Sequence, residues 1–185
     1  DSINTNFPGE RRGVLPPPPK NPFIHATIAF GYGLAVTPLQ IVHAYATLAT
    51  QGEKRPISLT KITDLSSVKG EQVLPPDVAQ ATLNMLTDVL TAKGTGSRAN
   101  IPGYKTAGKT GTTRVVGPQG YDPNRHIGLF AGITPVDNPR LATIVVVEEP
   151  NEAHYYGGLV AAPIYKSVVS KALHILNIPP DNTST

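Results

Sequence analysis

Apolar side chains recur at helical spacing in the segment that follows Thr37. The Thr37 hydroxyl is suited to an N-cap, Pro38 suits the first helical position, and Gln40 stands three residues after the cap. The apolar positions behind this signal are Ile41, Ala44, Tyr45 and Leu48. The pattern predicts a helix over residues 38–50, terminated by Gly52.

Two further segments have the pattern of amphipathic helices. Asp77 is suited to cap a helix that we expect to end near Lys93 and Gly94. Its apolar face comprises Val78, Ala81, Met85, Leu86, Val89 and Leu90. A final helix is predicted over residues 162–176, with Pro163 in its first turn. One side of that helix presents Ile164, Val168, Ala172 and Ile175.

Three β-prone runs lie between these helices, at about residues 104–116, 126–133 and 140–148. Their short connections, residues 117–120 and 135–139, are typical of antiparallel neighbours and not of βαβ units. The run from Leu141 to Val147 is continuously apolar, which predicts a central strand buried on both faces. Antiparallel strands followed and preceded by helices indicate an α+β fold, an antiparallel sheet packed by helices.

The remaining segments are less regular. Residues 56–63 alternate enough to indicate another strand, and residues 65–72 resemble a polar loop. Residues 1–22 are rich in Pro and Gly, and the four successive prolines from Pro16 to Pro19 favour an extended surface connection. Because the chain begins at Asp1 and not at Met, we expect a fragment or a processed product.

Composition excludes several classes of protein. Of the 185 residues, 39% are hydrophobic and 16% charged, which is typical of a globular chain. The formal net charge of +3 is too small and too scattered for a nucleic-acid surface. The absence of cysteine excludes disulfides and a thiol nucleophile. No apolar run reaches the roughly 18–20 residues that span a bilayer, and no pattern indicates a metal or a cofactor.

The most specific local signal surrounds Lys109 and fits two unrelated patterns. Residues 103–110 satisfy the nucleotide-binding pattern G-x-x-x-x-G-K-[ST], and an apolar run ends in Glu148 downstream. A P-loop requires a buried strand before the glycines and a helix beginning at the lysine. The flanks here are Gly-rich before the motif and β-branched after it, so a P-loop NTPase remains only a remote alternative.

The same residues also contain Lys109-Thr110-Gly111-Thr112, a K-T-G-T element whose flanks favour a strand at the edge of a sheet. A peptide substrate can pair with such an edge, and Gly111 has no side chain to obstruct it. Lys109 supplies positive charge, and the hydroxyls of Thr110 and Thr112 are suited to hold a carboxylate. Arg114 lies two residues further, on the same strand face as Thr112, and can reinforce that contact.

Other segments extend this signal to a family. They are Gly9-Glu10-Arg11, Phe30-Gly31-Tyr32-Gly33 with residues 36–40, and Tyr155-Tyr156-Gly157-Gly158 with Ala162-Pro163. Over nearly all 185 residues, and in the same order, the chain resembles the class B penicillin-binding proteins. The likeness is greatest to the division-specific peptidoglycan D,D-transpeptidases of the penicillin-binding protein 3 type. It implies the transpeptidase fold that this family shares with serine β-lactamases.

The resemblance also implies a chemistry. In this family a serine of an S-x-x-K motif attacks the D-Ala-D-Ala carbonyl of a stem peptide, and β-lactams acylate the same serine. Lys109 and Thr112 would then be catalytic, with the Thr112 backbone N–H in the oxyanion hole. Thr110, Gly111 and Arg114 would bind substrate. Tyr155 and Tyr156 would form an aromatic wall, and Tyr32 would line the cleft.

The family's motif order is S-x-x-K, then S-x-N, then K-T-G. Ser66-Ser67-Val68-Lys69 and Ser2-Ile3-Asn4 imitate the first two motifs, but their order is wrong and Ser66 lies in a polar loop. We therefore expect residues 1–185 to be the C-terminal portion of a transpeptidase domain, inactive alone because the nucleophile is absent. None of the five histidines has a ligand spacing or a nucleophile partner, although His126 is expected near the K-T-G strand.

The expected partners are the peptidoglycan stem peptide, β-lactam antibiotics, the remainder of the transpeptidase domain and, by family likeness, cell-division proteins. The same likeness implies a location at the outer, periplasmic face of the cytoplasmic membrane, through an N-terminal membrane segment outside this chain. The alternative from a different class is a non-catalytic peptidoglycan-binding or scaffold module that retains the fold.

Overall fold

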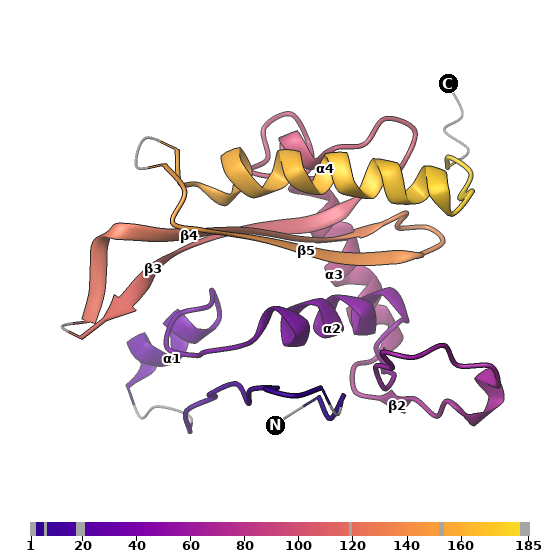
Figure 1. The fold of residues 1–185 in the computed structure, drawn as a ribbon, viewed down its shortest axis with the longest axis horizontal. Helices are drawn as coiled ribbons and strands as arrows, with labels where there is room; N and C mark the ends of the chain where they lie inside the picture. Colours follow the sequence, from indigo (N-terminus) through magenta and orange to yellow (C-terminus); the bar gives the residue numbers. More distant parts are fainter. Residues whose placement is uncertain (1–2, 6, 18–20, 119, 152–153, 182–185) are drawn as a thin grey trace.

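The computed structural model describes residues 3–5, 7–17, 21–118, 120–151 and 154–181. These residues form a central antiparallel sheet between two layers of helices (Figure 1). The sheet comprises β3 (Ala107–Gly117), β4 (Gly120–Thr134) and β5 (Leu141–Glu148), in the order β3-β4-β5. The expected α+β class is confirmed.

Helix α4 (Gly157–Ile175) covers one face of the sheet, and α2 (Pro38–Ala49) covers the other (Figure 1). Helix α3 (Pro76–Asp88) packs near the start of β3, and α1 (Pro22–Ile28) precedes α2. Two short elements, β1 (Glu53–Lys54) and β2 (Glu71–Gln72), form a separate two-stranded sheet. Single 3₁₀ turns occur at Leu65–Ser67 and Ser97–Ala99.

The helices form where their local signals predict, although two of them have different ends. At α2 the capping box is complete: Thr37 Oγ1 accepts from Gln40 N at 3.1 Å, and Thr37 N donates to the Gln40 side chain at 2.8 Å. At α3 the N-cap is Pro75, and Asp77 lies inside the first turn. That helix ends at Asp88 and not near Lys93, because the chain reverses where Gly96 N donates to Val89 O.

The sequence places the start of α4 too late. The helix begins at Gly157, so Pro163 lies in the second turn and not the first. Its first N–H, that of Gly157, donates to Thr112 Oγ1 on β3 at 3.1 Å. A sheet hydroxyl therefore satisfies one of the unpaired donors at the helix start, and no local pattern announces such a partner. The short helix α1 is also absent from the sequence predictions.

Two strand predictions are wrong. Residues 56–63 contain no strand, since Ser58 Oγ accepts from Thr60 N and no neighbouring strand pairs with the segment. Strand β5 is not central: β4 occupies the middle of the described sheet, and β5 lies at an edge. The sequence also predicts that this strand is buried on both faces; α4 and α2 both contact it, but residues 141–147 are only half-buried. Pro16 and Pro17 lie outside helices and strands, and Pro18 and Pro19 lie outside the described residues.

Alternation along β4 divides the core into two layers. On the α4 side, the ring of Phe130 packs edge-on against Tyr165 with centroids 4.7 Å apart. On the other side, Ile133 packs with Leu83, Ala107 and Val136 beside α2 and α3. The Tyr165 hydroxyl shares a buried hydrogen-bond chain with Thr134 and Thr106, at 2.9 and 3.0 Å. This chain fixes the start of β3 relative to α4.

Candidate active site

Lys109, Thr110, Gly111 and Thr112 lie in the middle of β3, which forms one edge of the sheet. Each of them has a partner on β4, from Ala131 opposite Lys109 to Gly128 opposite Thr112. The chain therefore runs extended through Lys109, with neither a phosphate-binding loop nor a helix beginning there. The P-loop alternative is wrong, and the predicted edge strand is confirmed.

The side chains of Thr110, Thr112 and Arg114 share one face of β3, as the two-residue period predicts. Thr110 Oγ1 donates to Thr95 Oγ1 at 2.9 Å, and Thr112 Oγ1 accepts the Gly157 N–H, so both threonines face α4. Because Thr112 accepts from a backbone amide, its own hydroxyl hydrogen remains available to a ligand. Thr110 has already given its hydrogen to Thr95.

Lys109 lies on the opposite face of β3 from these threonines and is exposed. Its Nζ donates to the Thr110 carbonyl at 3.0 Å. The ion pairs found among the described residues are Arg55–Glu53, Lys105–Asp137 and Arg125–Glu149, and none of them involves Lys109. Its ammonium is therefore a positive charge at the sheet edge with no carboxylate partner in the described part of the chain.

Gly111 is also required by the packing of the sheet itself. A Cβ at this position would lie 2.9 Å from two side-chain carbons of Leu129 on β4. On the α4 side, a Cβ at Gly157 would meet the carbonyl oxygens of Gly111 and Leu129. Two glycines thus allow the β3 backbone to lie against both Leu129 and the beginning of α4.

An aromatic pocket of about 360 Å³ lies beside Thr112 and Arg114. It is lined by Tyr32, Thr112, Thr113, Arg114, Tyr121, His126, Tyr155 and Tyr156. Tyr155 stacks on Tyr156 with centroids 4.6 Å apart, and the His126 ring stacks on Tyr155 at 3.9 Å. The hydrogen bond with Tyr156 raises the pKa of the Tyr155 hydroxyl. The pocket thus unites five of the residues singled out in the sequence: Tyr32, Thr112, Arg114, Tyr155 and Tyr156.

Tyr32 reaches this pocket from the Phe30-Gly31-Tyr32-Gly33 turn. Gly31 and Gly33 have φ of 97° and 77°, a left-handed conformation that glycine adopts without strain. The Tyr32 ring meets Tyr121 edge-on, with centroids 6.3 Å apart. Lys109 and Thr110 lie outside the pocket, and Gly111 lines a neighbouring cavity on the α2 side.

Sequence reasoning missed Thr95 and Tyr121, and it placed His126 near the motif without a role. Tyr121 belongs to the part of β4 that extends beyond the predicted strand, at the tip of the β3–β4 hairpin. Residues 122–125 do not alternate between apolar and polar side chains, so the local sequence contains no signal that the strand reaches Tyr121. Thr95 lies in a turn before the 3₁₀ helix, and nothing in its local sequence indicates contact with Thr110.

The residues that imitate the missing motifs do not form a nucleophile site. Ser66 is exposed on the Leu65–Ser67 turn, and its hydroxyl donates to Asp64 Oδ1 at 2.6 Å instead of contacting Lys69. This bond lowers the pKa of the Asp64 carboxyl. Ser2 lies outside the described residues. Within the described part of the chain, no cluster of His, Asp or Glu is suited to a metal, and no helix is long and apolar enough to cross a membrane.

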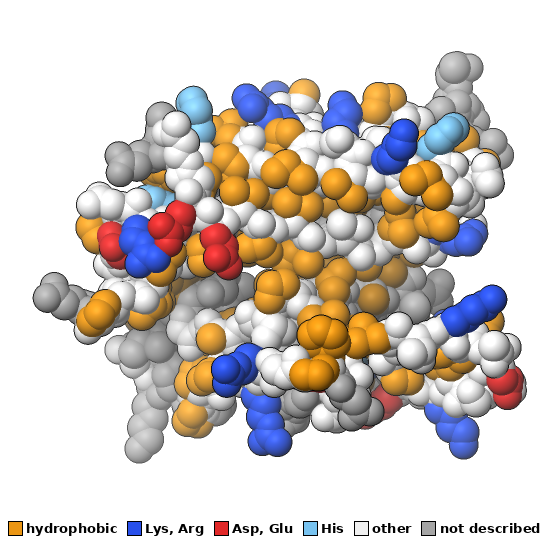
Figure 2. Space-filling view, viewed as in Figure 1, with side chains coloured by type: hydrophobic (Ala, Val, Ile, Leu, Met, Phe, Trp, Pro, Cys, Tyr) orange, Lys and Arg blue, Asp and Glu red, His pale blue; other side chains and the backbone are white. Residues whose placement is uncertain are grey.

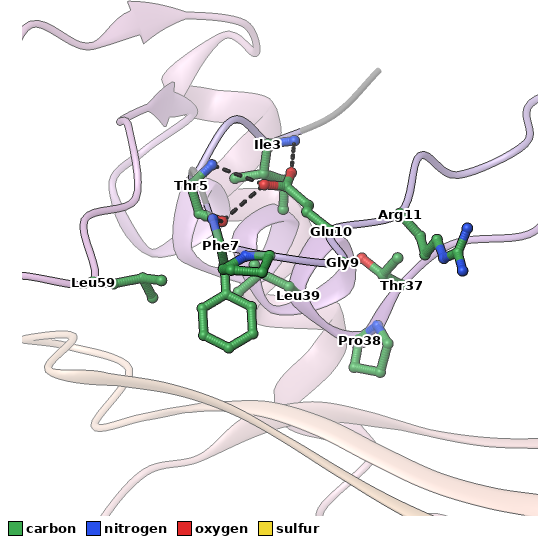
Figure 3. Close-up of a pocket in the computed structure, with 11 residues that line it drawn as sticks. Ile3, Thr5, Phe7, Gly9, Glu10, Arg11, Thr37, Pro38, Leu39 and Leu59 are labelled. Carbon is green, nitrogen blue, oxygen red and sulfur yellow. Dashed lines mark hydrogen bonds between the residues drawn. The ribbon is translucent and has the colours of Figure 1, made fainter.

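A second cavity, of about 490 Å³ and mainly apolar, lies at the N-terminal loop and the start of α2 (Figure 3). The Glu10 carboxylate organises this loop by accepting from the backbone N–H groups of Ile3 and Thr5 and from the Thr5 hydroxyl. Phe7 and Leu59 line the cavity and are largely exposed. It shares no lining residue with the aromatic pocket.

The edge strand with K-T-G-T and the helix α4 behind it can now be compared with known protein families. Residues 1–170 match the model of the penicillin binding protein transpeptidase domain. The chain therefore belongs to the penicillin-binding protein transpeptidase family.

The relatives place it more narrowly. The chain is 40% identical over its full length to the peptidoglycan D,D-transpeptidase FtsI of Escherichia coli K12, covering 31% of that protein. It is 37% identical to the probable peptidoglycan D,D-transpeptidase PenA of Neisseria flavescens, covering 99% of this chain and 46% of that protein. The chain thus spans less than half of the length of these curated relatives.

A solved structure has the same fold. The transpeptidase domain of penicillin-binding protein 3 from Burkholderia pseudomallei superposes with a TM-score of 0.88 at 35% identity. The superposition covers 97% of this chain and 54% of that domain. The recognition of a penicillin-binding protein 3 type chain and the expected transpeptidase fold are confirmed.

Proposed function

We propose that this chain is the C-terminal part of a peptidoglycan D,D-transpeptidase that cross-links stem peptides in septal cell-wall synthesis and binds penicillin. The observation that supports this most is the free edge of β3 at Lys109–Thr112, beside a pocket that contains Arg114. A peptide ending in D-Ala-D-Ala pairs with this edge as an added strand. Its terminal carboxylate lies at Thr112 and Arg114.

The chemistry is a two-step acyl transfer. A serine outside residues 1–185 attacks the carbonyl between the two D-Ala residues, forming an ester and releasing the terminal D-Ala. The amine of a neighbouring stem peptide then attacks the ester, forms the new amide and regenerates the serine. The Thr112 N–H and the N–H of the nucleophile bind the oxyanion in both steps. Lys109 supplies positive charge beside it.

The hydrogen bonds of Thr110 and Thr112 indicate that the two residues contribute differently to binding the carboxylate. Thr112 accepts from Gly157 N and has its hydrogen free, whereas Thr110 donates to Thr95. Thr112 and Arg114 are therefore the main donors to the carboxylate, with Thr110 acting through Thr95. Tyr155, Tyr156 and Tyr32 enclose the group next to the scissile bond, and Gly111 keeps the strand against the sheet.

Two surfaces of this chain are suited to contact the remainder of the transpeptidase domain. Strand β5 has one edge without a neighbouring strand in the described part of the chain, although helices cover both its faces. The cavity at Phe7 and Leu59 exposes apolar side chains (Figure 3). Both are suited to the segment that contains the nucleophile. We also propose that the whole protein lies at the outer face of the cytoplasmic membrane, with division proteins as partners; its family relationship supports this.

Fluorescent penicillin tests the proposal. The parent protein that contains this chain should be labelled at a serine outside residues 1–185, and the isolated chain should not be labelled. Thr112→Val should slow acylation of the parent roughly tenfold or more, because a hydrogen bond to a charged group contributes about 1.5–3 kcal/mol. Thr91→Val, at the exposed turn after α3 and outside the pocket, is the matched control.

Labelling at Ser66 or at any other serine of this chain would overturn the assignment of the nucleophile. An unlabelled parent would instead indicate the non-catalytic scaffold module. Equal acylation rates for Thr112→Val and Thr91→Val would remove Thr112 from the carboxylate site.

A further inference from the structure

The aromatic pocket contains a cationic side chain and no carboxylate. Its lining residues include four tyrosines, one permanent cation (Arg114) and one histidine (His126), and none of them is acidic. Arg114 is absent from the ion pairs found among the described residues. A concave site with an unpaired guanidinium and hydroxyl donors is suited to an anionic group.

His126 lies on the same side of the sheet as Arg114. The two residues are direct partners across β3 and β4, where side chains begin roughly 5 Å apart. The His126 imidazole is held against Tyr155, with ring planes inclined by 15°. Because Tyr155 also stacks on Tyr156, the imidazole is packed within a row of rings, and it lines the same pocket as the Arg114 guanidinium.

The carboxylates near His126 do not line the pocket. Glu149, which follows β5, is paired with Arg125 through its carboxylate, with Arg125 Nε donating at 3.0 Å. Glu148 lines the cavity on the α2 side of the sheet, together with Thr113. The neighbours in the pocket are neutral hydroxyls of Tyr32, Tyr121, Tyr155 and Tyr156. Among the described residues no carboxylate lines the pocket, so a ligand anion is the available partner for Arg114.

We propose that His126 is a specificity-determining residue that, when protonated, joins Arg114 in selecting a substrate or inhibitor with a carboxylate at this pocket. This inference rests on the proposed function, in which the D-Ala-D-Ala carboxylate lies at Thr112 and Arg114. The face of Tyr155 stabilises the imidazolium, and the bound carboxylate relieves its repulsion from Arg114.

The direction in which ligand affinity changes with pH follows from the protonation state that the ligand prefers. Imidazole side chains become cationic on the acidic side of neutrality, whereas a peptide carboxylate stays ionised down to about pH 4. A ligand that binds the protonated form better therefore binds more tightly as the pH falls from 8 to 6. A ligand without the carboxylate gains nothing from this proton.

The test uses competition against fluorescent penicillin labelling of the parent protein. Two peptides compete, both ending in D-Ala-D-Ala, one with a free carboxylate and one with a C-terminal amide. For the wild type, the carboxylate peptide should compete about fivefold better at pH 6 than at pH 8, while the amide peptide shows no such change. His126→Phe retains the ring stack and removes the charge, so its carboxylate and amide peptides should show the same pH response.

His126→Tyr is the second variant, because it also retains a ring on Tyr155, and melting temperatures equal to the wild type establish that both variants are folded. A fivefold pH effect that persists in both variants would overturn the role of His126. An equal pH effect with the amide peptide would overturn carboxylate selection. If the wild type is never labelled, the proposed function itself fails, and this outcome is distinct from the other two.

Discussion

Tyr45 illustrates how the environment of one residue determines its chemistry. Its ring packs beside the buried cluster of Leu83, Ala107, Ile133 and Val136, and burial raises the pKa of its hydroxyl to about 12. A tyrosine in an unfolded chain ordinarily ionises near pH 10. The folded state therefore favours the neutral hydroxyl, and this contribution to stability is complete below pH 10 and is lost as the pH rises toward 12.

We predict that Tyr45→Phe makes the free energy of unfolding less sensitive to alkali. Above pH 10 the slope should decrease by up to about 1.4 kcal/mol per pH unit, as measured by urea denaturation between pH 8 and 11. Tyr121→Phe is the control, since that ring is 51% exposed. If both variants retain the slope of the wild type, Tyr45 is not the buried group that resists ionisation.

At the scale of elements, the contact between α4 and β3 is the one that shapes the candidate site. The first N–H of α4 donates to Thr112, and Gly157 lies directly over the backbone of Gly111 and Leu129. The same hydrogen bond fixes the Thr112 hydroxyl and the beginning of α4. Two of the four tyrosines that line the pocket, Tyr155 and Tyr156, immediately precede this contact.

We predict that Gly157→Ala disturbs both stability and acylation. Its Cβ has no room against the carbonyl oxygens of Gly111 and Leu129, so the helix start must move, at a cost of about 1–3 kcal/mol. Thermal unfolding and penicillin acylation of the parent protein measure the two effects. In Gly117→Ala the new Cβ meets Gly120 O at a comfortable 3.7 Å, so this variant should match the wild type. Equal behaviour of the two variants would contradict the close contact.

At the scale of the whole molecule, hydrophobic and charged side chains are unevenly distributed over the surface. Figure 2 shows hydrophobic side chains distributed over the face of α4 and the sheet, with acidic side chains toward both ends of this view. Of the two edges of the sheet, β3 has Lys109, Arg114 and a register shift near Val116, which oppose pairing along its full length and leave Lys109–Thr112 for a short peptide. The β5 edge is apolar from Leu141 to Val147 and lacks these features.

We therefore predict that the isolated chain self-associates through β5 as its concentration rises, as measured by size-exclusion chromatography with light scattering. Thr143→Lys should reduce the association, because an edge lysine opposes strand addition. Gln80→Lys introduces the same charge on the exposed surface of α3 and should leave the association unchanged. A chain that stays monomeric at every concentration would contradict this expectation.

The sequence predicted the parts of the fold that depend on neighbours along the chain. The Thr37 capping box, the edge strand at Lys109 and the shared face of Thr110, Thr112 and Arg114 all follow from spacings of two to four residues. The strand predicted at residues 56–63 failed because alternation alone supplies no partner for the backbone. The predicted start of α4 failed because Pro163 is a local signal, whereas the true start depends on Thr112.

The sequence by itself determined that this chain has a K-T-G-T strand and the other segments of a penicillin-binding transpeptidase, because side-chain chemistry and strand period are local properties. Only the tertiary structure decided that Tyr32, Tyr121, His126 and the two tyrosines before α4 surround Arg114. It also placed β5 at an edge. These arrangements depend on packing between residues far apart in the chain, and such packing is fixed when the sheet and its helices assemble.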